Sequence, residues 1–111
     1  MTFATSSASH ATQLLRMRAA RDHTVANLAS IRQRLSRTAE SRTRAEPDLP
    51  ASHRRHSSDW PRQHEERFQR ILSELTSEAR HELGALEAKL ARQTAAISDH
   101  HLRRARELAS S

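Results

Sequence analysis

The sequence predicts an all-α fold in which two long helices form an antiparallel coiled-coil hairpin. One glycine and three prolines among 111 residues leave few places for turns, which is typical of long helices. Only 35% of the residues are hydrophobic and 3% aromatic, too few for a broad globular core. Apolar residues recur at helical spacing in two segments on either side of a polar linker. We therefore expect an elongated hairpin that gains further core by self-association into a four-helix bundle or by docking on a larger protein.

The first residues, MTFATSSASHAT, are small and hydroxylated. This composition predicts a disordered N-terminus over residues 1–8. The alternative is a targeting signal, because mitochondrial-type presequences and bacterial type III export signals have a similar composition. No secretory signal core and no run of 18 apolar residues is present, so we expect a cytoplasmic protein without a transmembrane segment.

A first helix is predicted over residues 9–45. Leu14, Leu28 and Leu35 contribute to a seam with spacings of three and four, which Arg21 interrupts. The helix must end before Pro47, because proline disfavours the helical conformation in the residue that precedes it.

Residues 46–58, EPDLPASHRRHSS, form the predicted linker, since two prolines stand in a polar stretch. A second helix is predicted over residues 59–109. Ser58 or Asp59 could supply its N-cap, and Pro61 is tolerated in its first turn.

The second helix carries the strongest pattern of the chain, an apolar stripe with an eleven-residue repeat. Such a repeat keeps the stripe on one face of a nearly straight helix. Its positions are Phe68, Leu72, Leu75, Ala79, Leu83, Leu86, Leu90, Thr94, Ile97, His101, Ala105 and Leu108. Gly84 lies beside the stripe and either permits close approach of a partner helix or is a tolerated defect.

Folding the chain back at the linker predicts how the two seams meet. If residues 46 and 59 lie level, Leu35 lies beside Phe68 and Leu14 lies beside Leu90. The residues predicted to hold the hairpin together are Leu28, Leu35, Phe68, Leu72, Leu75, Leu83, Leu86 and Leu90. In this register the second helix outruns the first from about residue 96, so its end is predicted to overhang as a docking surface.

The predicted partner-binding surface combines that overhang with the basic face of the first helix. Residues 1–58 contain ten arginines against four acidic residues, whereas residues 59–111 are balanced. The candidate partner-binding residues are Ile97, Leu102, Leu108, Arg16, Arg18, Arg32, Arg34 and Trp60. Trp60 has an alternative structural interpretation, in which it packs on the linker. Non-specific nucleic-acid binding by the arginines is the alternative function, because phosphate contacts need only such charges.

Candidate residues for chemistry are few. The chain has no cysteine, which excludes thiol nucleophiles and cysteine-ligated metals, and a thin hairpin offers no desolvated cleft for paired carboxylates. We expect no enzyme activity, no cofactor and no metal. His53, His56 and His64 suggest a weak divalent metal site, but solvated linker residues are the favoured interpretation.

The segment LLRMRAARDHTVANLASIRQRL, followed by a linker and a second long charged helix, resembles the small coiled-coil stalk proteins of type III secretion and flagellar export systems. The resemblance covers the two-helix layout and the arginine-punctuated first helix. It implies a helical hairpin that associates with the export ATPase and binds chaperones. We therefore expect a non-enzymatic adaptor, stalk or chaperone-like protein, a homo-oligomer or part of a hetero-complex, in a bacterial export machine.

Overall fold

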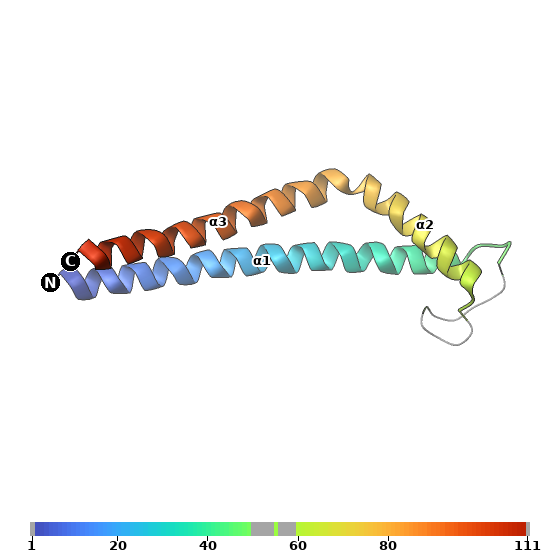
Figure 1. The fold of residues 1–111 in the computed structure, drawn as a ribbon. Helices are drawn as coiled ribbons and strands as arrows, with labels where there is room; N and C mark the ends of the chain where they lie inside the picture. The colour runs from blue at the N-terminus through green and yellow to red at the C-terminus, as the bar shows by residue number, and fades with distance from the viewer. Residues whose placement is uncertain (1, 50–54, 56–59, 111) are drawn as a thin grey trace. The chain divides into compact units, whose positions relative to one another are not determined.

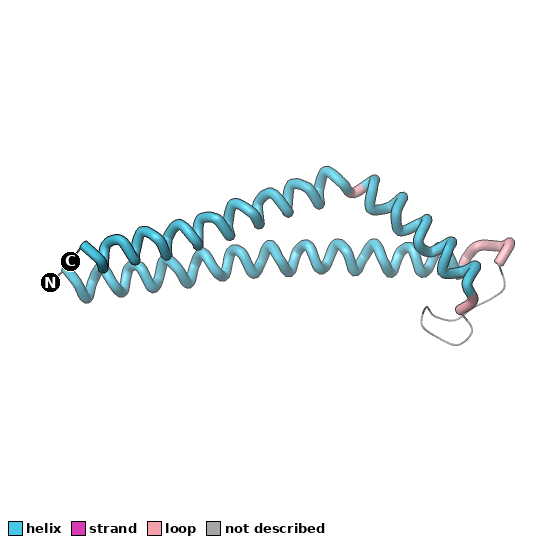
Figure 2. The backbone as a smooth tube through the Cα atoms, viewed as in Figure 1, coloured by secondary structure: helices cyan, strands magenta, loops and turns pink. Residues whose placement is uncertain are grey.

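The computed structural model describes residues 2–49, 55 and 60–110, and within these ranges every regular element is an α-helix (Figure 2). Helix α1 is Thr2–Arg44, α2 is Arg62–Glu78 and α3 is Arg80–Ser110 (Figure 1). The all-α class is confirmed. The described residues hold three helices where the sequence pattern predicts two.

Helix α1 begins at Thr2, earlier than the predicted start at residue 9, whereas the disorder predicted for residues 1–8 stays a prediction. The chain contains no glycine or proline before Pro47, and therefore nothing stops the helix from continuing toward the N-terminus. At its other end α1 stops at Arg44, just before Pro47 as predicted.

The predicted second helix is divided at Ala79. This residue has φ −89° and ψ 5°, outside the helical region. Its N–H still donates to the carbonyl of Leu75 at 3.0 Å, and its own carbonyl accepts from the N–H of Leu83 at 3.0 Å. The interruption is therefore a single residue, and no glycine or proline marks it in the sequence.

The start of α2 also differs from the prediction. Pro61 occupies the N-cap position rather than the first turn and makes no side-chain capping bond. The predicted caps, Ser58 and Asp59, lie outside the described residues. Within the parts of the chain that are described, no helix is both long and apolar enough to cross a membrane.

The chain divides into two compact units. We call Met1–Leu28 together with Gly84–Ser111 the terminal unit, and Ala29–Leu83 the central unit. The predicted single hairpin domain is thus resolved into two parts, each with its own packed side chains.

The central unit has an apolar core between α1 and α2. Its members are Ala39, Phe68, Ile71 and Leu75, with Leu35, Trp60 and Leu72 packed against them. The hydroxyl of Thr43, which is fully buried, donates to the carbonyl of Ala39 at 2.8 Å, so its own helix satisfies it. The predicted proximity of Leu35 and Phe68 agrees with this cluster.

The terminal unit has a seam with a heptad pattern and a mixed composition. Its buried and half-buried positions on α1 are His10, Leu14, Met17, Arg21, Thr24 and Leu28. Those on α3 are Leu86, Leu90, Gln93, Ile97, His100 and Arg104. Both sets alternate spacings of three and four, which is the coiled-coil pattern. Half of these side chains are polar, and this seam is correspondingly weaker than the core of the central unit.

Beyond Leu90 the predicted eleven-residue stripe agrees with the buried face only at Ile97. Thr94, His101 and Ala105 are exposed, and the positions beside them in the sequence, Gln93, His100 and Arg104, turn inward instead. The two patterns separate because the stripe steps four residues from Leu90 to Thr94, as an eleven-residue repeat requires, whereas the buried positions keep the heptad spacing and step three, to Gln93.

Candidate protein-interaction surface

Arg55 contacts α1, α2 and the apolar core of the central unit. Its Nε donates to both carboxylate oxygens of Glu65, at 3.1 and 2.9 Å, and its backbone N–H donates to Glu40 Oε1 at 3.2 Å. Its Cζ lies 4.1 Å from the ring centroid of Phe68, which is a cation–π distance. Arg55 thus contacts α1 through Glu40 and α2 through Glu65 and Phe68.

Glu65 accepts two further hydrogen bonds from side chains. Trp60 Nε1 and Gln69 Nε2 each donate to it at 3.2 Å. The hydrogen bonds from Arg55 are the main cause that lowers the pKa of Glu65 from 4.5 to about 2. Partial burial opposes this shift, and the hydrogen bonds from Gln69 and Trp60 add to it. Trp60, a candidate partner anchor, is half-buried, donates to Glu65 and packs against the core. Its ring lies near those of His64 and Phe68, which are on α2 rather than on the linker, and a role as partner anchor stays a prediction.

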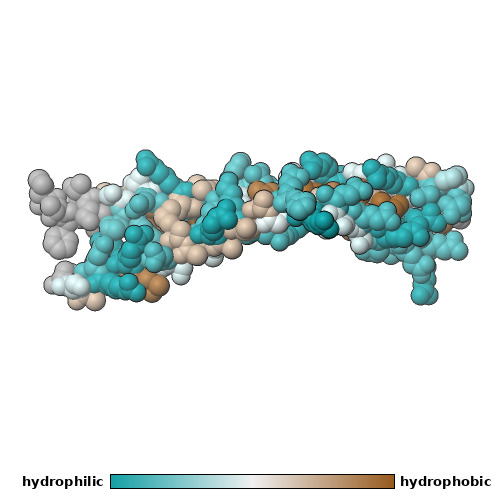
Figure 3. Space-filling view, turned by 90° about the horizontal axis from the view of Figure 1, so that it is seen from above, coloured by the Kyte–Doolittle hydropathy of each residue, from teal (hydrophilic) through white to brown (hydrophobic). Residues whose placement is uncertain are grey.

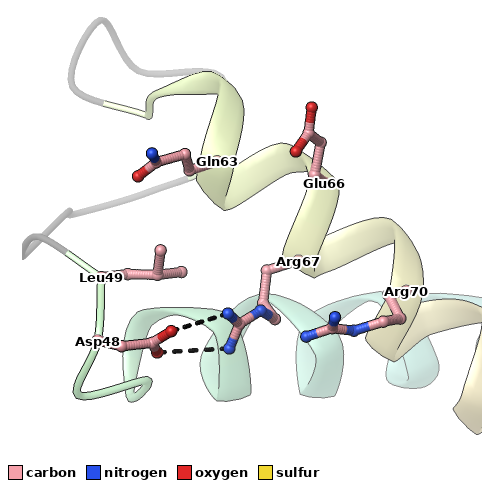
Figure 4. Close-up of a pocket in the computed structure, with 6 residues that line it drawn as sticks. All are labelled: Asp48, Leu49, Gln63, Glu66, Arg67 and Arg70. Carbon is pink, nitrogen blue, oxygen red and sulfur yellow. Dashed lines mark hydrogen bonds and ion pairs between the residues drawn. The ribbon is translucent and has the colours of Figure 1, made fainter.

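A second polar group joins the end of α1 to α2. Arg67 lies 3.1 Å from Glu46 and donates to Asp48 at 2.9 Å, which lowers the pKa of Asp48. A shallow open pocket beside this pair is lined by Asp48, Leu49, Gln63, Glu66, Arg67 and Arg70 (Figure 4). Opposite charges balance within the pocket, so its lining does not favour an anion or a cation.

The predicted hairpin residues lie where packing occurs. Phe68, Leu75, Leu83 and Leu28 are buried. The others, Leu35, Leu72, Leu86 and Leu90, are half-buried. They belong to two different units, Leu28, Leu86 and Leu90 to the terminal unit and the others to the central unit.

The predicted overhang is wrong at its first residue. Ile97 is only 7% exposed and His100 5%, so both are covered within the terminal unit. In the predicted register His10 lies level with residue 95, whereas in the structure its ring lies 5.2 Å from that of His100. The register is therefore shifted by about five residues from the predicted one. Because of this shift and of the earlier start of α1, residues of α1 cover the part of α3 that was predicted to overhang.

Buried polar groups accompany this contact. His10 Nε2 lies 3.1 Å from Glu107 Oε2. Within the described residues, His10 Nδ1 and Gln93 Oε1 are buried without a hydrogen-bond partner. Unsatisfied buried groups cost about 1–3 kcal/mol each, which further weakens the terminal unit.

The remaining predicted apolar contacts stay on the surface. Leu102 is 54% exposed and Leu108 56%, and Leu15 and Val25 are exposed as well. All four of these large exposed apolar residues belong to the terminal unit. Elsewhere, the face drawn in Figure 3 is mainly hydrophilic, with apolar side chains in small separate patches.

The predicted basic residues are also exposed. Arg16 and Arg18 lie on the terminal unit, and Arg32 and Arg34 on the central unit. Arg21, in contrast, lies in the seam and pairs with its neighbour Asp22 at 3.1 Å. The basic face of α1 is therefore divided between the two units.

Within residues 2–49, 55 and 60–110, no three acidic or histidine side chains are placed to hold a metal ion. His64 is fully buried, and neither ring nitrogen has a hydrogen-bond partner among these residues. Its ring instead lies 5.1 Å from that of Trp60. The other two histidines of the suggested site, His53 and His56, lie outside the described residues.

Pattern reading missed Arg55, Glu65 and the polar seam positions. Arg55 carried no signal because a linker arginine is ordinarily solvated. The seam positions could have been found by continuing the heptad spacing from Leu83 regardless of polarity.

No family model, no curated protein and no solved structure matches this chain.

Proposed function

We propose that this chain is a non-enzymatic coiled-coil adaptor whose helices pair antiparallel and whose terminal unit binds partner proteins. The observation that supports this function best is the distribution of exposed apolar side chains. Leu15, Val25, Leu102 and Leu108 are all on the terminal unit. A partner that covers these side chains removes their apolar surface from water, which favours binding.

The seam of the terminal unit supports the same proposal. Buried polar groups such as Gln93 and His10 lower the stability that two helices gain from pairing. A partner that covers the exposed leucines adds the apolar burial that the seam lacks. The central unit, which has the apolar core and the Arg55 contacts, then serves as the stable part of the adaptor.

A role in protein export fits this proposal. Stalk and chaperone-like proteins of the export systems that the first helix and linker resemble work through helical contacts alone. We propose the same mode for this chain, as a homo-oligomer or a subunit of a hetero-complex.

Site-specific photo-crosslinking tests the proposal. A photoreactive amino acid replaces Leu102 in one variant and the exposed Ser73 of the central unit in a control variant. In cells of the source organism we expect a discrete crosslinked product from position 102 and none from position 73. No product from position 102, or the same products from both, would refute the proposal.

Nucleic-acid binding is the second candidate function. Arg34, Arg37 and Arg42 are exposed and make no ion pair with another described residue, so their charges are available to phosphates. A salt titration with duplex DNA separates the two candidates. Weak binding without a steep loss on adding salt excludes the nucleic-acid function.

A further inference from the structure

A basic row runs along the outer face of α3. Its charged members follow the helical spacing of one face; they are Lys89, Arg92, Asp99, Arg103 and Arg106. All five are exposed. The row carries a net charge of +3, since four of its members are basic and one is acidic.

Most of this charge is not neutralised within the molecule. Asp99 lies 3.4 Å from Arg103 and pairs with it. Lys89, Arg92 and Arg106 make no ion pair with any residue that the structure describes. The row therefore presents three basic side chains to a partner.

Exposed apolar side chains lie beside this row. Leu102 stands four residues before Arg106, on the same face of the helix. Ala105 continues the exposed apolar surface toward the end of α3, whereas Leu108 lies about 120° around the helix from Leu102. The outer face of α3 is thus itself amphipathic, with an apolar strip next to a basic one.

The charge of the terminal unit indicates which partner fits this face. The unit contains eight basic residues and four acidic ones, a net charge of +4. A second copy would bring the same charge into contact and be repelled. A partner with acidic residues beside its apolar stripe would instead be attracted and oriented.

We infer that the outer face of α3, from Lys89 to Arg106, binds an amphipathic helix of a partner protein whose apolar stripe is flanked by acidic residues. This inference rests on the proposed adaptor function and adds the chemistry of the partner. Apolar side chains of the partner cover Leu102 and Ala105, as in other complexes where a helix docks by one face. Its carboxylates receive charge-assisted hydrogen bonds from Arg92 and Arg106.

A designed peptide provides the test. The probe is a helical peptide of about three heptads with leucine and alanine on one face and glutamate on both flanks. One control peptide has lysine in place of glutamate, and another keeps the glutamates but has serine in place of leucine. Binding to the full chain is measured by fluorescence anisotropy, and self-association by sedimentation.

We expect the acidic amphipathic peptide to bind and both control peptides to bind at least about tenfold more weakly. The double variant Arg92→Glu, Arg106→Glu should lose about tenfold or more in affinity. The matched double variant Arg70→Glu, Arg80→Glu, on the central unit, should bind as the unmodified chain does. Raising the salt to about 1 M, where the Debye length is about 3 Å, should weaken binding.

Three results would overturn the inference. They are equal binding of the acidic and basic peptides, equal binding of the serine control, and dimers through α3 that exclude the peptide. If position 102 still crosslinks a protein in cells while the peptides fail, the adaptor function stands and only the partner chemistry is wrong. If position 102 crosslinks nothing, the adaptor function falls as well.

Discussion

Replacing Leu75 by alanine tests whether the apolar cluster of the central unit holds the fold. Leu75 is 7% exposed and packs with Phe68, Ile71 and Ala39. The substitution removes three buried carbons at about 0.8 kcal/mol each. Because a two-helix core can relax around the gap, the cavity cost is small. We expect the free energy of unfolding to fall by about 2–3 kcal/mol.

The matched control is Leu102→Ala, which removes the same atoms from a side chain that is 54% exposed. It should cost less than about 1 kcal/mol, partly because alanine favours helix slightly more than leucine does. Both variants are measured by urea unfolding followed by circular dichroism at several protein concentrations. With a slope of about 1–2 kcal/mol/M, the midpoint of Leu75→Ala should fall by more than about 1 M. Equal effects of the two substitutions would refute the assignment of the core.

Four further predictions concern other parts of the chain. Glu65→Gln should reduce the dependence of the free energy of unfolding on pH in the acid range. The pKa of Glu65 is lowered from 4.5 to about 2 in the folded state, so its stabilisation is present above about pH 4.5 and is lost as the pH falls toward 2. Since the side chain is 37% exposed, we expect about 1 kcal/mol at neutral pH, and an unchanged acid transition between pH 4.5 and 2 would contradict the role of Glu65. Gly84→Ala should increase the free energy of unfolding by about 0.5–1 kcal/mol and so raise the melting temperature, because a Cβ at this position meets nothing within 4 Å. A lower melting temperature would indicate a partner helix against Gly84. In hydrogen exchange followed by mass spectrometry, the seam of the terminal unit should exchange faster than α2, since half of its seam positions are polar whereas α2 packs Phe68, Ile71 and Leu75 into an apolar cluster, and the reverse order would show that the terminal unit is the more stable. Leu83→Asp places a charge at a position that is 7% exposed and should unfold the helices. Leu102→Asp should instead keep the helical circular dichroism and lose binding of the acidic amphipathic peptide measured by fluorescence anisotropy; unchanged peptide binding would argue against docking at this residue.

The helical class of the chain follows from its composition and local pattern. The scarcity of glycine and proline, together with three-and-four spacing around Phe68 and Leu75, identifies helices and their packed faces without tertiary information. Pro47 marks the end of α1 because its ring constrains the residue before it. Leu102 and Leu108 are exposed as predicted, but the predicted reason, an overhanging helix end, does not hold at Ile97, which is buried.

Other features depend on long-range contacts. The interruption at Ala79 has no local signal, since alanine is the best helix former. The contact between His10 and His100 shows that the register differs from the one extrapolated from the linker, because a small error in the loop shifts every pair beyond it. Arg55 acquires its role only when α1 and α2 bring Glu40 and Glu65 within its reach.

The eleven-residue stripe of the predicted second helix shows which features the sequence determines and which the tertiary structure determines. Local periodicity, a property of single-helix geometry, determines that residues from Phe68 to Leu90 face a packed side. Beyond Leu90 two faces of α3 have comparable apolar content, so periodicity alone cannot choose between them. The tertiary structure buries Ile97 and His100 against α1 and leaves Leu102 and its basic neighbours outside. The physical reason is that a helix face is buried only where a second element lies against it, and that element is supplied by residues about 90 positions away.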